Sequence, residues 1–194
     1  MSKNKKRKET KYAINIKNEK IIVEKQEKYK KIPNKTTKKT KEKIYSIATI
    51  ILIIDQIVKL LITNKLVLNE ELTIIPNFFS LYYVENTGAA FSILENQIFL
   101  LVIISFFFLF FIDKMLSTEE ISTELTKLSF GMIIGGVLGN LIDILLHHCV
   151  IDYLSFTFFK YKFAVFNIAD IAIVLGIVLL TIDIYLEEKK NVRK

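Results

Sequence analysis

Four long runs of apolar residues constrain this chain more than any other feature of its sequence. They cover residues 44–62, 97–112, 128–146 and 163–182. Each run is close to the roughly 20 residues that an α-helix needs to cross the hydrocarbon core of a bilayer. The overall composition agrees, with 52% hydrophobic residues and a mean hydropathy of +0.37. We therefore predict a membrane protein of mainly α class with four transmembrane helices.

The distribution of charge predicts how these helices are oriented. Residues 1–43 carry 17 Lys or Arg against 5 Asp or Glu, whereas the remaining residues carry 10 against 15. Because basic segments stay on the cytoplasmic side of a membrane, we expect this extension to be cytoplasmic. Four crossings return the tail at 187–194 to the same side. The extension is rich in Lys and poor in large apolar residues, so we expect it to be disordered beside a membrane domain at 44–186.

Asn and Asp residues lie near the ends of the third and fourth runs. Asn140 precedes Asp143 by three positions, and Asn167 precedes Asp170 by the same interval, so each pair projects from one helical face. With the predicted orientation, both pairs lie in the outer half of the bilayer. At about 1.5 Å of rise per residue, Asp170 is expected roughly 10 Å below the start of its run. Ionisable residues at such depth indicate function.

Two carboxylates are sufficient for acid–base hydrolysis without a metal. Asp143 near the end of the third run, Asp152 just beyond it and Asp170 in the fourth run are all expected near the same face of the membrane. Two nearby carboxylates resist simultaneous ionisation, so one holds a proton while the other activates water. Coupled titration makes that proton a property of the pair and not of either residue.

Other polar residues in the runs are expected to support this pair. Asp55 and Lys59 are four positions apart in the first run and neutralise each other within one helix, which favours a structural role. The Asn residues are expected to form hydrogen bonds between helices and to hold the carboxylates in place.

Two segments outside the runs favour β-structure. Residues 66–94 contain aromatic and β-branched stretches followed by a turn at 86–88, and residues 152–163 form a second strand candidate. We predict a small extracytoplasmic β-sheet, or cradle, between helices 1 and 2. Such a sheet is suited to rest on the membrane and to bind an extended peptide at its edge, and the loop at Gly88 is a candidate gate. The alternative is a simple interfacial belt of aromatic residues.

Cys149 is the one cysteine of the chain and follows His147 and His148. A single cysteine forms no internal disulfide, and these residues supply too few ligands for a zinc site. No third group at a recognisable spacing orients the thiol as a nucleophile. We expect these residues at the level of the lipid headgroups, and we expect neither a metal nor a cofactor.

Five short segments resemble, in order, the signatures of the lipoprotein signal peptidase family, also called signal peptidase II. The segments are 55–59 (DQIVK), 85–91 (ENTGAAF), 135–143 (GGVLGNLID), 150–153 (VIDY) and 166–170 (FNIAD). The resemblance covers about residues 45–186 and leaves out the basic extension.

The resemblance implies an intramembrane aspartic endopeptidase of the bacterial cytoplasmic membrane. Such an enzyme removes the signal peptide of a prolipoprotein by cleaving before a cysteine that carries diacylglycerol. Its catalytic aspartates match Asp152 and Asp170. The expected substrate-binding or supporting residues are Asn86, Asn140, Asp143, Asn167, Asp55, Lys59 and Gly88.

The expected partners follow from the same resemblance. They are the diacylglyceryl-prolipoprotein substrate, membrane lipids and inhibitors of the globomycin type, with no nucleic acid. The active site is expected near the outer leaflet of a monomer.

Two positions depart from the family pattern. Ile144 stands where an arginine usually follows the third segment, and Ser155 stands where an acidic residue often follows the first catalytic aspartate. A missing arginine removes a charge that orients carboxylates or peptide carbonyls. His147, His148 and Lys160 are candidates to offset that loss. Because both aspartates remain, we expect an active enzyme.

Three other functions compete with this one. A catalytically weakened prolipoprotein-binding relative is consistent with Ile144. A small membrane transporter would carry polar residues through the full depth of the bilayer, whereas the inner half of the fourth run is apolar apart from Asp183. A structural membrane protein leaves the convergence of Asp152 and Asp170 unexplained.

Overall fold

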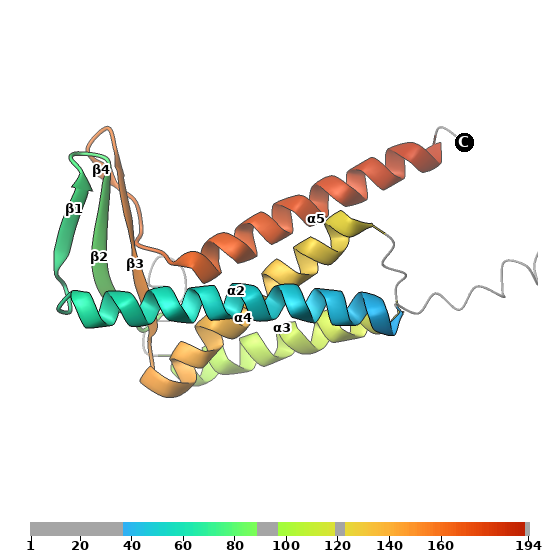
Figure 1. Cartoon of the computed structure of the whole chain (residues 1–194), viewed down its shortest axis with the longest axis horizontal. Coiled ribbons are helices and arrows are strands. Elements are labelled where there is room, and N and C mark those ends of the chain that lie inside the picture. Colours follow the sequence, from blue (N-terminus) through green and yellow to red (C-terminus); the bar gives the residue numbers. More distant parts are fainter. Residues whose placement is uncertain (1–36, 89–96, 119–122, 193–194) are drawn as a thin grey trace, which may run out of the picture. The chain divides into compact units, whose positions relative to one another are not determined.

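The computed structural model describes residues 37–88, 97–118 and 123–192, and within them four helices and four strands (Figure 1). In chain order these are α2 (Lys38–Lys65), β1 (Glu71–Ile75), β2 (Phe79–Asn86), α3 (Ile98–Thr118), α4 (Glu124–His147), β3 (Val150–Phe158), β4 (Tyr161–Lys162) and α5 (Ile168–Val192). All four helices are long and apolar enough to cross a membrane, which confirms the predicted spans. Residues 1–36 of the predicted extension lie outside the described residues, and α2 begins after Thr37, whose side chain caps it.

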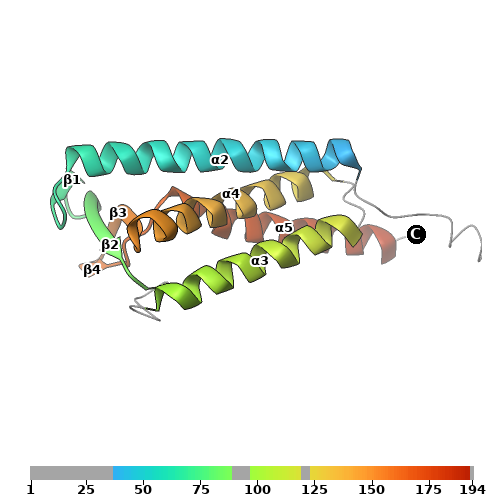
Figure 2. The same cartoon turned by 90° about the horizontal axis from the view of Figure 1, so that it is seen from below.

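Helix α4 is the centre of the helical part. In its most apolar stretch 67% of the residues are buried, compared with 22% in α2 and α5 and 6% in α3. It packs against each of the other three helices, and Figure 2 shows it between α2 and α3 with α5 behind. The apolar residues that the other helices leave exposed are therefore suited to contact lipid.

Glycines in α4 allow the neighbouring helices to approach closely. A Cβ atom at Gly135 would lie 2.6 Å from the carbonyl oxygen of Ala48 in α2. A Cβ atom at Gly136 would lie 2.5 Å from the carbonyl oxygen of Ala169 in α5. Small residues at helix contacts serve this purpose in membrane proteins, where packing replaces the hydrophobic effect between helices.

The strands form one antiparallel sheet with the order β1-β2-β3-β4. As predicted, β1 and β2 lie between the first two helices, and the second strand candidate adds β3 and β4 from the connection between α4 and α5. The pairing of β2 with β3 runs from Phe79 opposite Phe156 to Asn86 opposite Val150. The sheet thereby joins the two connections and satisfies their backbone groups.

An ion pair joins the outermost strands across one face of the sheet. The Nζ atom of Lys162 in β4 lies 2.8 Å from Glu71 in β1, and it also lies 4.4 Å from the ring centre of Tyr82 in β2. The first and fourth strands of a sheet are about 14 Å apart, a distance that the extended side chains of Lys162 and Glu71 bridge. The contact therefore ties the two edges of the predicted cradle together.

Helix α5 starts later than its apolar run predicts. Phe166 forms two backbone hydrogen bonds with Leu154 of β3. The N–H of Phe166 donates to the carbonyl oxygen of Leu154 at 3.1 Å, and the N–H of Leu154 donates to the carbonyl oxygen of Phe166 at 2.8 Å. This pairing keeps the chain extended up to Asn167, so α5 begins at Ile168 and not at Phe163. The helical rise that was predicted between Phe163 and Asp170 is therefore wrong, because Asp170 lies in the first turn of the helix.

We expect Gly136→Ala to destabilise the protein by about 1–3 kcal/mol, because the added Cβ atom meets a backbone carbonyl of α5 that has no freedom to move aside. On helix propensity alone the change would be favourable by about 1 kcal/mol. Thermal unfolding in lipid or detergent measures the difference. Val178→Ile adds one carbon at an exposed position of α5 and is the control. Equal stability of both variants would contradict the close contact.

Candidate active site

The N-terminus of α5 is held by a capping box. The backbone N–H of Asp170 donates to Oδ1 of Asn167 at 2.9 Å, and the backbone N–H of Asn167 donates to Oδ2 of Asp170 at 3.1 Å. In this reciprocal arrangement each residue satisfies a backbone donor that the helix leaves free. The interval of three residues noticed in the sequence is thus the interval between the N-cap residue, Asn167, and the third residue of the helix, Asp170, in a capping box.

Asn167 also reaches the carboxylate of Asp152 in β3. Its Nδ2 atom donates to Oδ1 of Asp152 at 2.7 Å and to the carbonyl oxygen of Ile151 at 3.3 Å. The other oxygen of Asp152 accepts from Nδ2 of Asn86 in β2 at 3.0 Å. Asn167 therefore contacts both candidate catalytic aspartates. One of them, Asp152, lies in strand β3, and the other, Asp170, lies in helix α5.

Asn140 of α4 forms hydrogen bonds with Asp170, Asn167 and Lys59. Its Nδ2 atom donates to Oδ1 of Asp170 at 2.8 Å. Its Oδ1 atom accepts from Asn167 at 3.1 Å and from Lys59 of α2 at 3.0 Å. Each polar end of this amide is used, which fixes its orientation and that of Asp170.

Lys59 is a buried cation between two carboxylates. Its Nζ atom lies 2.8 Å from Asp55 and 2.6 Å from Asp143, and all three side chains are at most 2% exposed. The predicted pair within α2 is present, but the lysine also neutralises a carboxylate of α4. A buried charge needs close partners to offset its desolvation, so the group acts as an electrostatic link between the two helices.

Two supporting residues were missed in the sequence. Gln56 donates from Nε2 to Asp143 at 2.9 Å and to the carbonyl oxygen of Gly139 at 3.1 Å. The hydroxyl oxygen of Tyr153 accepts the backbone N–H of Ile168 at 3.3 Å. An amide within an apolar run was a usable signal for Gln56, whereas nothing local distinguishes Tyr153 from other tyrosines.

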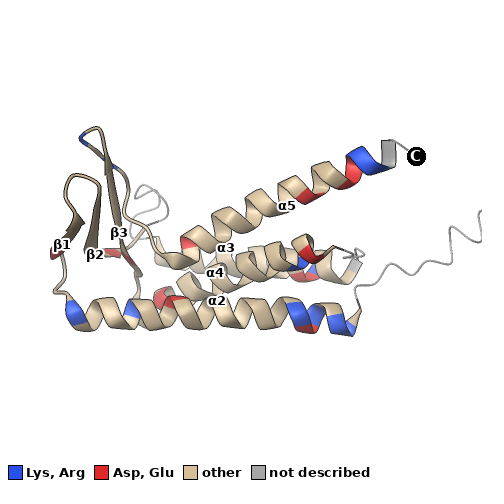
Figure 3. Ribbon diagram, turned by 45° about the horizontal axis from the view of Figure 1, so that its top comes forward, with Lys and Arg blue, Asp and Glu red and all other residues tan. Residues whose placement is uncertain are grey.

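The backbone donors at the start of α5 are all satisfied by side chains of the site. Besides the capping box and Tyr153, Oδ1 of Asp55 accepts the N–H of Ala169 at 3.0 Å. Side chains from α2 and β3 therefore stabilise the first turn of α5, which begins where the pairing of Phe166 with Leu154 ends. Figure 3 shows acidic positions at this end of α2 and α5, near the sheet and away from the Lys-rich far ends.

Burial raises the pKa of Asp152 from its ordinary value of 3.8 to about 7. The nearby charge of Asp170 acts in the same direction, whereas the hydrogen bonds from Asn86 and Asn167 and the charge of Lys59 oppose the shift. Near neutral pH this carboxyl group is therefore available both as a proton donor and as an acceptor. Such a pKa is typical of a catalytic carboxyl group.

Four more residues were singled out in the sequence, namely Gly88, His147, His148 and Cys149. The N–H of Gly88 donates to Oδ1 of Asn86 at 2.9 Å, while residues 89–91 of the same segment lie outside the described residues. Cys149 is buried, and burial raises its pKa to about 11, so its thiol is protonated at neutral pH. His147 and His148 are exposed at the end of α4.

The two positions that depart from the family pattern are both buried. Ile144 is 5% exposed in α4, and Ser155 is 1% exposed in β3. The Ser155 hydroxyl has no hydrogen-bond partner among the described residues. The buried cation beside the aspartates is Lys59, whereas Lys160, one of the three candidates to offset the missing arginine, is exposed.

We expect Lys59→Met to destabilise the protein by about 3–5 kcal/mol, because Asp55 and Asp143 would remain buried without their cation. Lys162→Met is the matched control, since the ion pair of Lys162 with Glu71 is about 40% exposed and contributes about 1 kcal/mol or less. Unfolding of both variants under the same conditions gives the comparison. Similar losses of stability would argue against the electrostatic link.

We expect the stability of the protein to depend on pH through Asp152. Its pKa is raised in the folded state, so the folded state keeps a proton that the unfolded chain loses between pH about 4 and about 7. Stability from this group is complete at low pH and falls as the pH rises through that range. Unfolding temperatures measured from pH 4 to 8 should therefore decrease less in Asp152→Asn than in the parent. An identical pH dependence in the two proteins would contradict the raised pKa.

Comparison with known sequences identifies the family to which these features belong. A family profile described as signal peptidase (SPase) II matches residues 47–186. A curated relative, the lipoprotein signal peptidase of Symbiobacterium thermophilum, is 37% identical over 145 residues, which are 75% of this chain and 95% of that protein.

Two solved structures of bacterial membrane enzymes, both obtained by the in meso method, are similar to this fold. The first, at 2.3 Å resolution, has a TM-score of 0.70 and 28% identity and covers 76% of this chain and 90% of its own. The second, at 1.9 Å resolution, has a TM-score of 0.68 and 27% identity and covers 79% of this chain and 97% of its own. The match of the family profile across all four membrane helices and the identity with the curated relative confirm the predicted resemblance, so this chain belongs to the signal peptidase II family.

Proposed function

We propose that Asp152 and Asp170 are the catalytic pair of this peptidase. As a member of its family, the chain is an aspartic endopeptidase that removes signal peptides from prolipoproteins. The observation that carries the assignment is the position of Asn167, which donates its side-chain N–H to Asp152 and its backbone N–H to Asp170. The scissile bond in this proposal lies directly before the diacylglyceryl-modified cysteine.

The two carboxyl groups share one proton at the start of the reaction. The ionised carboxylate takes a proton from a water molecule, whose oxygen attacks the scissile carbonyl carbon. The protonated carboxyl donates its proton to the carbonyl oxygen, which gives a gem-diol. The proton left on the pair then passes to the amide nitrogen, and as the C–N bond breaks one gem-diol hydroxyl returns its proton to the pair, which leaves a carboxylic acid, a free amine and one proton again on the pair.

The surrounding residues fix the geometry and charge of this reaction. Asn86, Asn140 and Asn167 donate hydrogen bonds to the two carboxylates and hold their oxygens in defined directions. Lys59 supplies positive charge without a direct hydrogen bond to either of them. Asp170 remains partly exposed, so its carboxylate is accessible to water and substrate.

The proposed orientation places both termini in the cytoplasm and the site near the outer leaflet. The aspartate pair and the sheet lie at one end of the helices, whereas the Lys residues at the start of α2 and the end of α5 lie at the other. Basic residues favour the cytoplasmic side. A lipid-modified cysteine held at the membrane surface is then at the level of the catalytic pair.

The proposed partners of the site are the prolipoprotein and the surrounding lipids. Inhibitors of the globomycin type are expected to compete with the substrate at the aspartate pair. A monomer suffices for this arrangement, because all the side chains in the described site belong to one chain.

We expect Asp152→Asn and Asp170→Asn each to lower cleavage of a diacylglyceryl-prolipoprotein by at least about 100-fold, because each removes a proton donor or acceptor. The assay uses purified protein in lipid and follows release of the signal peptide. Asp183→Asn is the matched control, since Asp183 is a buried aspartate of α5 that accepts hydrogen bonds from Thr123 and Thr126, far from the pair. This control should retain activity.

Two outcomes would change the assignment. Full activity of either dyad variant would exclude its aspartate from catalysis. A folded parent without activity would favour a prolipoprotein-binding relative, and Ile144→Arg would then show whether the residue typical of the family restores cleavage.

A further inference from the structure

A continuous set of aromatic rings extends from the start of α5 to the tip of the β3–β4 hairpin. Phe166 stacks on Phe156 with ring centres 5.7 Å apart, and Phe156 stacks on Phe158 at 6.4 Å. Phe158 contacts Phe163 at 5.5 Å, which in turn contacts Tyr161 at 5.2 Å. Phe78 contacts Phe156 at 5.6 Å and Phe158 at 5.3 Å. We call the exposed rings of this set, together with Phe159 at the tip of the hairpin, the aromatic hairpin surface. It consists of Phe78, Phe158, Phe159, Tyr161 and Phe163.

The packing of the described chain leaves this surface uncovered. Phe158 and Phe163 are 44% and 46% exposed, Tyr161 is 63% exposed, and Phe159 is fully exposed. A contiguous group of large exposed apolar side chains indicates an interaction surface. Because the rings of Phe78, Phe158, Phe163 and Tyr161 form one connected set, this part of the surface has a defined shape before any partner binds.

The hairpin turn has an aromatic residue, Phe159, at a position whose left-handed backbone conformation favours Asn or Gly. Phe159 and Lys160 both have left-handed backbone conformations, with φ of 47° and 70°. Turns of this kind prefer Asn and Gly, and a bulky residue there costs of order 1–3 kcal/mol. The structure therefore keeps a strained, fully exposed Phe159 at the tip, which favours a role in binding over a role in stability.

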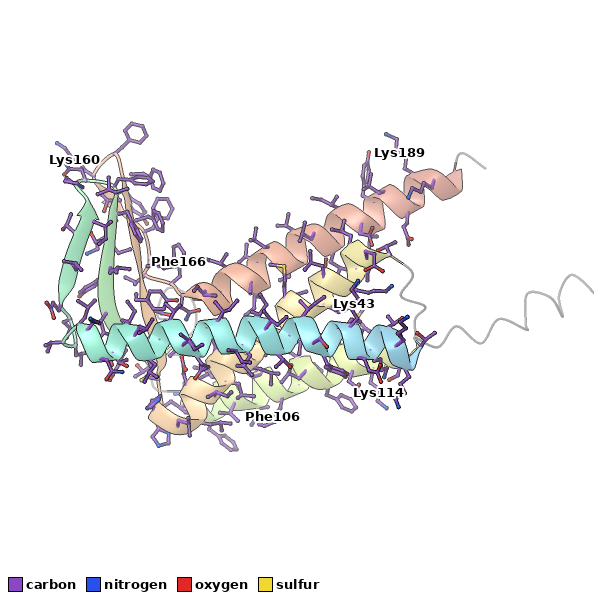
Figure 4. All side chains as sticks on the ribbon, viewed as in Figure 1. Lys43, Phe106, Lys114, Lys160, Phe166 and Lys189 are labelled. Carbon is purple, nitrogen blue, oxygen red and sulfur yellow. The ribbon has the colours of Figure 1, made fainter. Side chains whose placement is uncertain are left out.

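The position of the hairpin identifies its partner as the bilayer. Phe166 immediately precedes Asn167, the cap of the membrane-spanning α5, and it pairs with Leu154 of β3. Figure 4 shows Phe166 near the start of α5 and Lys160 at the tip of the hairpin. The aromatic hairpin surface is thus continuous with the end of a membrane helix, at the level where aromatic rings gather at membrane–water interfaces.

We propose that the aromatic hairpin surface lies in the headgroup region of the bilayer and anchors β3 and β4 to the lipid. Phe159 inserts its ring among the upper acyl chains, and Lys160 extends its ammonium group to the lipid phosphates. Strand β3 carries Asp152 as well as Phe158, so this anchor fixes the height of Asp152 relative to the membrane surface. The inference goes beyond the proposed function, and its test does not depend on catalysis.

The absence of tryptophan from the chain allows a direct test with a single fluorescent reporter. Phe159→Trp places the reporter at the tip of the hairpin. Thr73→Trp is the matched control, because Thr73 is exposed in β1, the edge strand farthest from β4. Thr73 pairs with Ser80 and Ser80 pairs with Ser155, so its side chain lies on the opposite face from Phe79 and Phe156. Tyr161→Trp repeats the measurement on the neighbouring strand in case the turn changes at Phe159.

All three reporters are measured in vesicles of phosphatidylcholine and phosphatidylglycerol, with or without bromine on the upper part of the acyl chains. We expect Phe159→Trp and Tyr161→Trp to emit at shorter wavelength than Thr73→Trp and to lose about half of their emission to brominated lipid, as rings at the interface do. Acrylamide in the water should quench Thr73→Trp more strongly than the other two variants.

Two results would overturn the proposal. Equal quenching of all three reporters by acrylamide, with no effect of brominated lipid, would place the hairpin in water. Protection of the hairpin reporters that appears only as the protein concentration rises would assign the surface to a second copy of the chain.

Discussion

The hydrogen bonds at the start of α5 are the interaction on which the rest of the site depends. A helix begins with backbone donors that it does not satisfy itself, and in a nonpolar surrounding each such donor needs a partner. Here Asn167, Asp170, Tyr153 and Asp55 supply the acceptors. The same contacts that start the helix also position Asp170 and connect it, through Asn167, to Asp152. The contacts that begin the helix are therefore the same contacts that position the proposed catalytic pair.

The buried charge of Lys59 connects this centre to the helix packing. Lys59 requires Asp55 and Asp143 as neighbours, and those neighbours require α2 and α4 to lie close together. The glycines of α4 make this approach possible, since a Cβ atom at Gly139 would lie 2.5 Å from Oδ2 of Asp55. The close approach of α2 and α4 at the glycines allows the buried charges to pair, and the pairing of these charges in turn holds the two helices together. Such an arrangement has few alternatives of similar energy, because every displacement leaves a charge or an amide without a partner.

The sheet gives the site a second fixed point outside the helices. Asp152 belongs to β3, and β3 is paired with β2 on one side and with β4 on the other. Asn86 at the end of β2 contacts Asp152, so the strand pairing orients one carboxylate while the helix cap orients the other. If the aromatic hairpin surface binds lipid, the bilayer also limits the movement of this strand. A reaction on a membrane-anchored substrate benefits from such control, because the reacting atoms must meet at one depth.

The sequence by itself determined the four membrane helices and the two β-forming segments, because length, hydropathy and β-preference act within each segment. It also predicted Asp152 and Asp170 as a pair, through the resemblance to the family, and their catalytic role stays a prediction. Tertiary structure alone decided where α5 begins, because the pairing of Phe166 with Leu154 overrides an apolar run that already starts at Phe163. It alone decided that Lys59 serves Asp143 as well as Asp55, and that Gln56 and Tyr153 belong to the site. These contacts join residues far apart in the chain, and local sequence patterns carry no information on which distant groups will meet.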